Sequence, residues 1–325
     1  MSAVEPTPPG RAQVFAGSTP PGSASAGSMP PASAGSMPPA SAGSTPPASA
    51  GPPAAGAASA GTTPPTGVHA ARARLRGTLR DGGQLVGTFV KLPGADVIAL
   101  AARAGLDFVV VDLEHSGLDE RTATDQLRLA ALAGLPALVR VPAVDPGQVN
   151  RLLEAGAVGV QLSTVRRRAD VEALRAASRY APHGRRSISL AHPSAGYGGD
   201  GLDRYLAAEA EHPPVLVAQI ETATTDDPLP ALLTGVDVGF VGTTDLAVSL
   251  GLSTTDDRGP LLRRTGDIAD AARATGVALG GWVAERSAET LDGCGLTDAR
   301  YLVVGSDLQL LGAGLRRLAA PARPA

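Results

Sequence analysis

The sequence predicts an α/β protein, a (β/α)8 TIM barrel that follows a disordered N-terminal extension. Three observations predict this fold. The chain has 325 residues, and about 255 of them follow a low-complexity tract, which is the usual size of one such barrel. Eight short runs, nearly continuously apolar, are typical of parallel strands buried on both faces. Between the runs lie stretches rich in Ala, Leu and Arg with the spacing of helices.

The first segment, residues 1–68, has the composition of a disordered tract. The unit GSMPPASA occurs twice in succession from Gly27, and no charged residue lies between Arg11 and Thr66. Such a tract cannot bury enough apolar area to offset the entropy lost on ordering. We therefore expect residues 1–68 to be a disordered Pro/Ala/Ser/Gly-rich repeat extension and residues 69–325 to be the barrel.

The predicted strands follow one another at regular intervals. In order, they are LVGTFV (85–90), FVVVDL (108–113), PALVRV (136–141), AVGVQL (157–162), PVLVAQI (214–220), DVGFVG (237–242), VALGGWV (277–283) and YLVVG (301–305).

Helical segments separate these strands. After the first four strands come ADVIALAARAG, DERTATDQLRLAALAG, DPGQVNRLLEAG and RADVEALRAASRYA. Asp residues near the starts suit N-caps, and Gly residues after the ends suit C-caps. No GxGxxG follows the first strand, which disfavours an open dinucleotide-binding sheet.

Composition narrows the class of protein further. The start MSAVEPTPPG lacks the basic and apolar regions of a secretory signal, and no window of about 18 apolar residues follows. A single cysteine, Cys294, fits a reducing cytoplasm. The net charge is -3, with acids and bases interspersed. We expect a cytoplasmic protein that binds neither nucleic acid nor membrane.

In a barrel of this kind, catalytic groups lie at the C-terminal ends of the strands. Four of the predicted strands end in ionisable or amide side chains. These are Asp112, Glu114 and His115 after the second strand, Arg140 on the third, Gln219 and Glu221 on the fifth, and Asp245 after the sixth.

Glu221 and Asp245 follow adjacent strands, so their carboxylates can converge. Two carboxylates with the amide oxygen of Gln219 form a set of hard oxygen ligands that suits Mg²⁺ or Mn²⁺. A Schiff-base mechanism, which would use a lysine in place of the metal, has one candidate at this rim, Lys91.

The ordered motifs resemble one family. DLEH after a strand, VRV with its Arg, AQIET, and GxxDL after GVDVGFVG resemble the HpcH/HpaI aldolase/citrate lyase family, the metal-dependent class II pyruvate aldolases. The resemblance runs from about Gly87 to Gly305. It implies a phosphoenolpyruvate/pyruvate-like barrel and an aldehyde-lyase that releases pyruvate or a related α-keto acid, plus an aldehyde, from a 4-hydroxy-2-oxo acid.

The resemblance also implies roles for individual residues. Glu221 and Asp245 would bind the cation, Mg²⁺ or Mn²⁺ with Co²⁺ as a further candidate. Arg140 would bond the keto oxygen as it becomes an enolate. His115 would transfer protons, paired with Glu154.

Four further residues would surround these groups. By the same resemblance, Asp112 and Glu114 would hold metal-bound waters, and Gln219 would lie beside metal and substrate. The backbone of Thr243 and Thr244 would receive the pyruvate carboxylate.

Departures from the family pattern bear on the substrate. The chain has Glu154 in place of an aspartate, Thr243 in place of a proline, Leu162 and Ser163 in place of a Val-Pro pair, and Ser187 in place of a glycine. We expect the metal chemistry to be retained and the substrate to differ from the aromatic-degradation intermediates typical of the family.

Two other functions stay open. One is a citrate-synthase-like or other biosynthetic enzyme that forms a carbon–carbon bond at the same site. The other, of a different class, is an inactive barrel that binds partners through its Pro-rich arm. The resemblance further implies a homo-oligomer, a hexamer or trimer of dimers that exchange their last helix.

Overall fold

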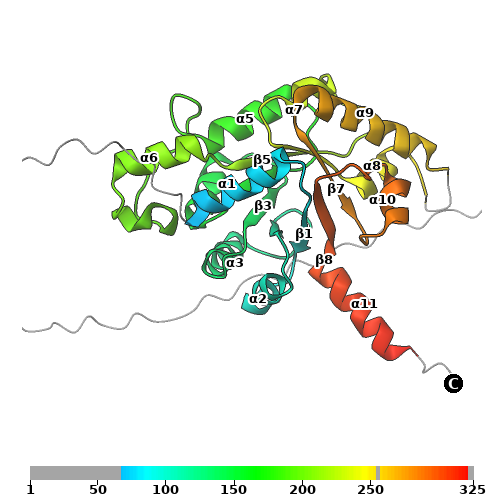
Figure 1. Ribbon diagram of the computed structural model, residues 1–325, viewed down its shortest axis with the longest axis horizontal. Helices are drawn as coiled ribbons and strands as arrows, with labels where there is room; N and C mark the ends of the chain where they lie inside the picture. The colour runs from blue at the N-terminus through cyan, green and yellow to red at the C-terminus, as the bar shows by residue number, and fades with distance from the viewer. Residues whose placement is uncertain (1–66, 254–256, 321–325) are drawn as a thin grey trace, which may run out of the picture. The chain divides into compact units, whose positions relative to one another are not determined.

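The computed structural model describes residues 67–253 and 257–320, and these residues confirm the predicted barrel (Figure 1). Eight strands form a closed sheet in sequence order. They are β1 (Leu85–Val90), β2 (Phe108–Asp112), β3 (Ala137–Val141), β4 (Gly159–Leu162), β5 (Val215–Ile220), β6 (Val238–Val241), β7 (Ala278–Val283) and β8 (Tyr301–Ser306). Each observed strand lies within a residue or two of its predicted bounds.

All neighbouring strands are parallel, and β1 closes the barrel by pairing with both β2 and β8. The C-terminal ends therefore meet at one rim. Two registers matter for that rim. Asp112 lies opposite Arg140 across β2 and β3, and Gln161 lies opposite Val217 across β4 and β5.

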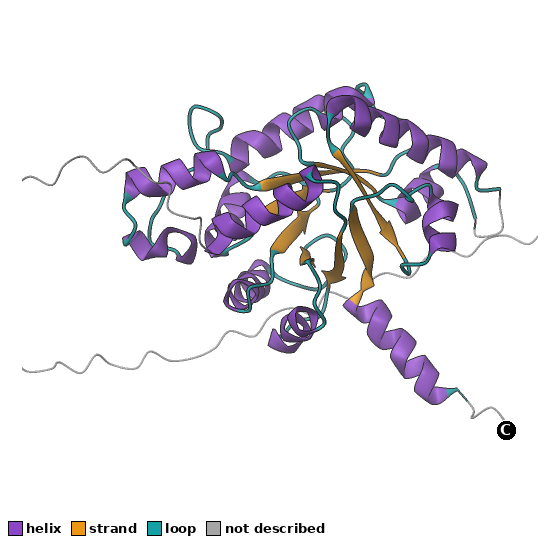
Figure 2. Cartoon of the chain, in the orientation of Figure 1, coloured by secondary structure: helices purple, strands orange, loops and turns teal. Residues whose placement is uncertain are grey.

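Helices surround the sheet (Figure 2). They are α1 (Gly67–Arg80), α2 (Ala95–Arg103), α3 (Glu120–Leu132), α4 (Pro146–Ala155), α5 (Arg168–Ser178), the 3-10 helix η1 (Pro193–Gly198), α6 (Leu202–Glu211), α7 (Leu229–Leu233), α8 (Thr243–Ser249), α9 (Gly259–Thr275), α10 (Ala288–Cys294) and α11 (Asp307–Ala319). The predicted aspartate caps form, because Asp119 accepts from Thr122 N and Asp145 from Gln148 N. No helix in the described ranges is long and apolar enough to cross a membrane.

The apolar side chains of the strands divide between two clusters. One cluster fills the barrel and includes Phe108, Phe240 and Tyr301, with Phe108 stacked on Tyr301 at a centroid distance of 4.3 Å. The other lies between the strands and the outer helices and includes Val109 and Val111. Alternate residues of β2 thus enter different clusters, which is why its valine run is buried on both faces.

Helix α1 precedes the first strand and was not among the predicted elements. The predicted extension, residues 1–68, lies outside the described residues except for its last two, which begin α1. Arg72 on α1 is fully buried and donates to the backbone oxygens of Ala157 and Val158 before β4. Arg76 pairs with Asp237 before β6. The helix is therefore bound to the N-terminal ends of the strands by arginine contacts.

Glu209 on α6 is a buried carboxylate that binds three side chains of this region. It accepts from Arg72 at 2.7 Å, His69 at 3.0 Å and Arg186 at 3.1 Å. Burial alone would raise the pKa of Glu209, but the charge of Arg72, the hydrogen bond from His69 and the charge of Arg186 outweigh it and hold the pKa well below its ordinary value. His69 is therefore buried and paired with Glu209.

We expect Glu209→Ala to reduce the free energy of unfolding by about 3–5 kcal/mol at pH 7, because it leaves Arg72 and Arg186 buried without their counter-charge. Denaturant unfolding measures this. Because the pKa of Glu209 is lower in the folded protein than its ordinary value of 4.5, the ionised carboxylate stabilises the fold at pH values above 4.5. This stabilisation is lost as the pH falls from 4.5 towards the pKa of the folded state. The difference between wild type and variant should therefore narrow below about pH 4.5.

Glu172→Ala is the matched control, because Glu172 is 60% exposed and pairs with Arg168 on the same helix. It should change stability by less than about 1 kcal/mol. A Glu209→Ala effect as small as that of the control would contradict the role given to the buried cluster.

Candidate active site

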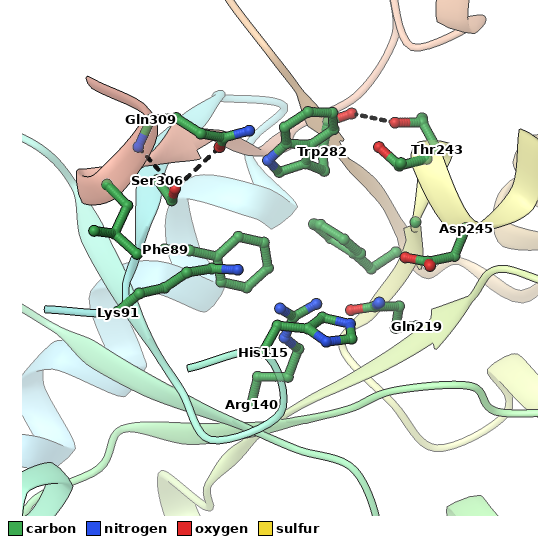
Figure 3. A pocket seen from close by; sticks show the side chains of 14 residues that line it. Phe89, Lys91, His115, Arg140, Gln219, Thr243, Asp245, Trp282, Ser306 and Gln309 are labelled. Atoms are coloured by element: carbon green, nitrogen blue, oxygen red, sulfur yellow. Dashed lines mark hydrogen bonds between the residues drawn. The ribbon is translucent and has the colours of Figure 1, made fainter. Parts of the chain in front are cut away.

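A cavity of about 430 Å³ opens at the C-terminal rim of the barrel (Figure 3). Its walls come from β1, β3, β5, β6, β7, the segment after β2, and the first turns of α8 and α11. The lining residues are Phe89, Lys91, His115, Arg140, Gln219, Phe240, Gly242, Thr243, Thr244, Asp245, Trp282, Ser306, Leu308 and Gln309.

Asp112 is the acid at the centre of one side of the rim, and it has no exposed surface. Arg140 donates to both of its oxygens, from Nε to Oδ1 at 2.8 Å and from Nη2 to Oδ2 at 2.5 Å. The backbone N–H groups of Glu114 and His115 also donate to Oδ1, and Lys91 Nζ lies 3.2 Å from Oδ2. Burial raises the pKa of Asp112, but the hydrogen bonds and charge of Arg140 outweigh it and lower the pKa. Asp112 is therefore an ionised carboxylate that fixes Arg140 in place.

The guanidinium of Arg140 is held on two further sides. Its Cζ atom lies 4.1 Å from the centroid of the Phe89 ring, a cation–π contact. Glu114 Oε2 lies 3.3 Å from Nε, and Glu114 Oε1 accepts from Ser163 Oγ at 2.6 Å. The arginine is thus a rigid cation at the base of the cavity.

Glu221 is the acid on the other side of the rim, directly after β5. Its Oε1 atom accepts from the backbone N and the Oγ1 of Thr164, at 2.8 and 2.7 Å. Thr164 adopts a φ of 48°, which is costly for a β-branched residue. The two hydrogen bonds explain why this strained conformation is kept at this position.

A row of amide side chains completes the hold on Glu221. Gln161 Nε2, on β4, donates to Gln219 Oε1 at 2.5 Å, and Gln219 Nε2 donates to Glu221 Oε2. Gln219 therefore uses its oxygen to accept from Gln161. That bond uses one of the two lone pairs of the oxygen, and its role as a metal ligand stays a prediction.

Glu221 and Asp245 form an uncompensated acidic pair. Burial raises the pKa of Glu221, and the negative charge of Asp245 raises it further, against the hydrogen bonds from Gln219 and Thr164. Asp245 lies in the first turn of α8 and lines the cavity. Within residues 67–253 and 257–320, no Lys or Arg forms an ion pair with either acid. Such a pair suits a divalent cation with oxygen ligands.

The glycine before α8 leaves room for this arrangement. A Cβ atom on Gly242 would lie 2.8 Å from Glu221 Cβ and would collide with Glu221 Oε2. The Gly242 backbone therefore allows the buried carboxylate to approach the start of α8.

The structure brings most of the predicted site residues to this rim. Six of them line the cavity: His115, Arg140, Gln219, Thr243, Thr244 and Asp245. Asp112, Glu114 and Glu221 lie directly behind and contact lining or rim residues. Glu154 is placed differently. It lies on α4, accepts from Asn150 at 3.2 Å and does not line the cavity, so its pairing with His115 stays a prediction.

Several functional contacts were not predicted. Thr164, Ser163 and Gln161 hold the predicted acids and amide through bonds across strands, and only the register of β4 against its neighbours would have indicated them. The sequence predicts no ion pair for Lys91, whose ammonium pairs with Asp112. Phe89 and Trp282 supply the aromatic walls.

The sequence of the chain is similar to those of known aldolases. The sequence model of the HpcH/HpaI aldolase/citrate lyase family matches residues 85–311. A hydroxypyruvate/pyruvate aldolase of Rhizorhabdus wittichii is 30% identical over 260 residues, 77% of this chain and 98% of that protein. A 4-hydroxy-2-oxovalerate aldolase of Novosphingobium aromaticivorans is 32% identical over 205 residues, 62% of this chain and 77% of that protein.

The fold of the chain is also similar to those of solved structures. The HpcH/HpaI aldolase from Desulfitobacterium hafniense has a TM-score of 0.68 and 25% identity, covering 77% of this chain and 99% of that one. Citrate synthase SbnG has a TM-score of 0.64 and 26% identity, covering 75% and 95%.

We expect Gly242→Ala to displace Glu221 and to destabilise the protein by about 1–3 kcal/mol, the usual effect of overpacking a close contact. Thermal unfolding measures the change. Gly266→Ala on α9 is the control, because a Cβ there meets nothing within 4 Å, and it should be neutral or slightly stabilising. Equal effects of the two substitutions would contradict the role given to Gly242.

Proposed function

This chain belongs to the HpcH/HpaI aldolase/citrate lyase family and is a carbon–carbon lyase, and we propose that it is a divalent-metal-dependent aldolase. The substrate would be a 4-hydroxy-2-oxo acid, and the products pyruvate or a related α-keto acid plus an aldehyde. The observation that carries the proposal is the uncompensated pair Glu221 and Asp245, which faces the same rim as the fixed cation of Arg140.

The residues that would hold a cation are Glu221 and Asp245. When bound, Mg²⁺ or Mn²⁺ would act as a Lewis acid towards the C2 oxygen of an α-keto acid. Thr164 and Gln219 fix the Glu221 carboxylate, so that acid would keep one orientation as substrate enters and leaves.

Arg140 would stabilise the charge that develops on the substrate. Breaking the bond between C3 and C4 leaves a pair of electrons that delocalises onto the C2 oxygen. A guanidinium held by Asp112 and stacked on Phe89 needs no reorganisation to meet that charge. The backbone at Thr243 and Thr244, in the first turn of α8, would receive the carboxylate of the keto acid.

His115 would move the proton. The C4 hydroxyl must lose a proton as the bond breaks, and His115 lies on the cavity wall with 54% of its side chain exposed. Glu114 Oε2 lies 3.8 Å from His115 Nε2. A histidine that is accessible to substrate and near a carboxylate is suited to accept and return a proton.

A bond-forming reaction at the same site is the second candidate. The likeness to citrate synthase SbnG over 95% of that chain favours it, because an enolate held at this rim could attack a carbonyl in the reverse sense. The two candidates share the acids, Arg140 and the cavity.

We propose a homo-oligomer, supported by the exposed leucines of α11, whose side chains at Leu310, Leu311, Leu315 and Leu318 are 52–84% exposed. The predicted cytoplasmic location stays a prediction, as do the water-holding roles of Asp112 and Glu114.

Addition of Mn²⁺ or Mg²⁺ should allow the protein to release pyruvate from oxaloacetate, and a chelator should abolish the release. Glu221→Gln and Asp245→Asn should each lower the rate at least roughly a hundredfold and weaken Mn²⁺ binding measured by calorimetry. Retained activity in either variant would contradict the metal site.

Inactivation by borohydride in the presence of pyruvate would instead favour a Schiff base at Lys91, and absence of all turnover would favour a binding protein.

Substitution of His115 should separate two reactions. His115→Ala should lower cleavage of a 4-hydroxy-2-oxo acid by about 10²–10⁴, because the hydroxyl proton has no acceptor. Decarboxylation of oxaloacetate requires no such proton and should fall much less. Parallel assays of both reactions with one enzyme preparation measure the difference, and an equal loss in both would contradict this role.

A further inference from the structure

We propose that Gln161, a fully buried residue of β4, is a positioning residue for the cation that Glu221 and Asp245 would hold. It would act through Gln219, by fixing which atom of the Gln219 amide faces Glu221. The inference rests on the proposed metal-dependent function and concerns a residue that is not among those lining the cavity.

The side chain of Gln161 points into the barrel. Its neighbours Val160 and Leu162 belong to the cluster between the strands and the outer helices, and side chains alternate along a strand. Gln161 lies opposite Val217 of β5, two residues before Gln219. The two amides therefore lie on the same face of the sheet, within reach of each other.

The amide of Gln161 is costly at this position. Its Nε2 atom donates to Gln219 Oε1 at 2.5 Å, but its own Oε1 atom is buried and has no hydrogen-bond partner among residues 67–253 and 257–320. A buried acceptor without a partner destabilises the fold, and an apolar side chain of the same length would avoid that cost. The bond to Gln219 is therefore the feature that accounts for an amide here.

That bond fixes the direction of the Gln219 amide. An amide has an acceptor oxygen and a donor nitrogen, so Gln219 turns its oxygen to the donor on Gln161 and its nitrogen the other way. The nitrogen then donates to Glu221 Oε2. In the reverse orientation the Gln219 oxygen would face the carboxylate oxygen, and two acceptors repel each other. Gln161 thus keeps Gln219 as a donor to Glu221.

Both oxygens of Glu221 have a donor as a result. Thr164 donates to Oε1 from its backbone N and its Oγ1, and Gln219 donates to Oε2. Figure 3 shows Gln219 on the same side of the cavity as Asp245, the second acid of the proposed cation site. A carboxylate that is already oriented loses less conformational freedom when it binds a cation. We therefore infer that Gln161 raises the affinity for the cation without touching it.

A double-mutant cycle, with Mn²⁺ binding measured by calorimetry, tests this role. Gln161→Met removes the donor, keeps the length of the side chain and should weaken Mn²⁺ binding about tenfold. Gln219→Met should weaken it by at least as much. The double variant should bind Mn²⁺ within about twofold of Gln219→Met alone, because Gln161 reaches Glu221 only through the Gln219 amide. Independent losses that multiply in the double variant, or no loss in Gln161→Met, would overturn the assignment.

Gln126→Met is the matched control. Gln126 on α3 is also buried, donates to the backbone oxygen of Leu92 at 2.7 Å, and has a buried Oε1 atom without a partner in the described part of the chain. Its hydrogen bonds reach neither Gln219 nor Glu221. Gln126→Met should therefore leave Mn²⁺ binding unchanged. Equal weakening in both variants would point to a general loss of structure and would contradict a specific role of Gln161.

A second variant and the wild type separate the remaining outcomes. Gln161→Leu also removes the donor and should weaken Mn²⁺ binding as Gln161→Met does, with thermal unfolding as the check that each variant folds. Failure of both variants to fold would show that Gln161 is needed for the fold and would overturn a positioning role. Wild type that bound no Mn²⁺ would contradict the proposed metal site itself, whereas equal binding by wild type and Gln161→Met would contradict only the role of Gln161.

Discussion

The buried ion pair between Asp112 and Arg140 is the interaction on which one side of the rim depends. The two residues lie opposite each other in the register of β2 and β3, so the barrel itself brings them together. An ionised acid with no exposed surface is stable only with charge and hydrogen bonds around it. Arg140 and Lys91 supply the charge, and the chain after β2 turns so that two N–H groups point at Oδ1. The ends of β1, β2 and β3 are thereby fixed to one carboxylate.

The other side of the rim is organised by hydrogen bonds without a counter-charge. Glu221 accepts from Thr164 on the segment after β4 and from the amide of Gln219 on β5, and that amide accepts from Gln161 on β4. These donors orient the acid but leave its charge uncancelled, because they are neutral. The strained φ of Thr164 is consistent with a site where geometry is maintained at a cost in conformational energy.

The sequence predicts the positions of the strands and of their rim residues better than it predicts the contacts between side chains at the rim. Each strand is a run of apolar residues bounded by polar ones. The sequence therefore predicts where a strand lies and which of its ends is at the rim, as for Phe108 to Asp112. Whether Gln161 touches Gln219, or Thr164 touches Glu221, depends on the register and on a backbone turn, which no local pattern encodes. Helix α1 was missed for a related reason, because the arginines that bind it to the barrel have partners far along the chain, such as Glu209. Glu154, predicted from resemblance to pair with His115, lies on α4 and accepts from Asn150, and its pairing with His115 stays a prediction.

The distribution of charge across the cavity suggests an order of assembly for the reaction that we propose. On the β1–β3 side, Asp112 and Glu114 balance Arg140 and Lys91, so that side is neutral and rigid before any ligand binds. On the β5–β6 side, no Lys or Arg of residues 67–253 and 257–320 forms an ion pair with Glu221 or Asp245, and the charges that these acids carry when ionised would repel an anionic keto acid unless a cation bound first. A divalent cation would cancel those charges, after which a keto acid could approach it and Arg140 together. The electrostatics of the rim therefore favour binding of the cation before binding of the substrate.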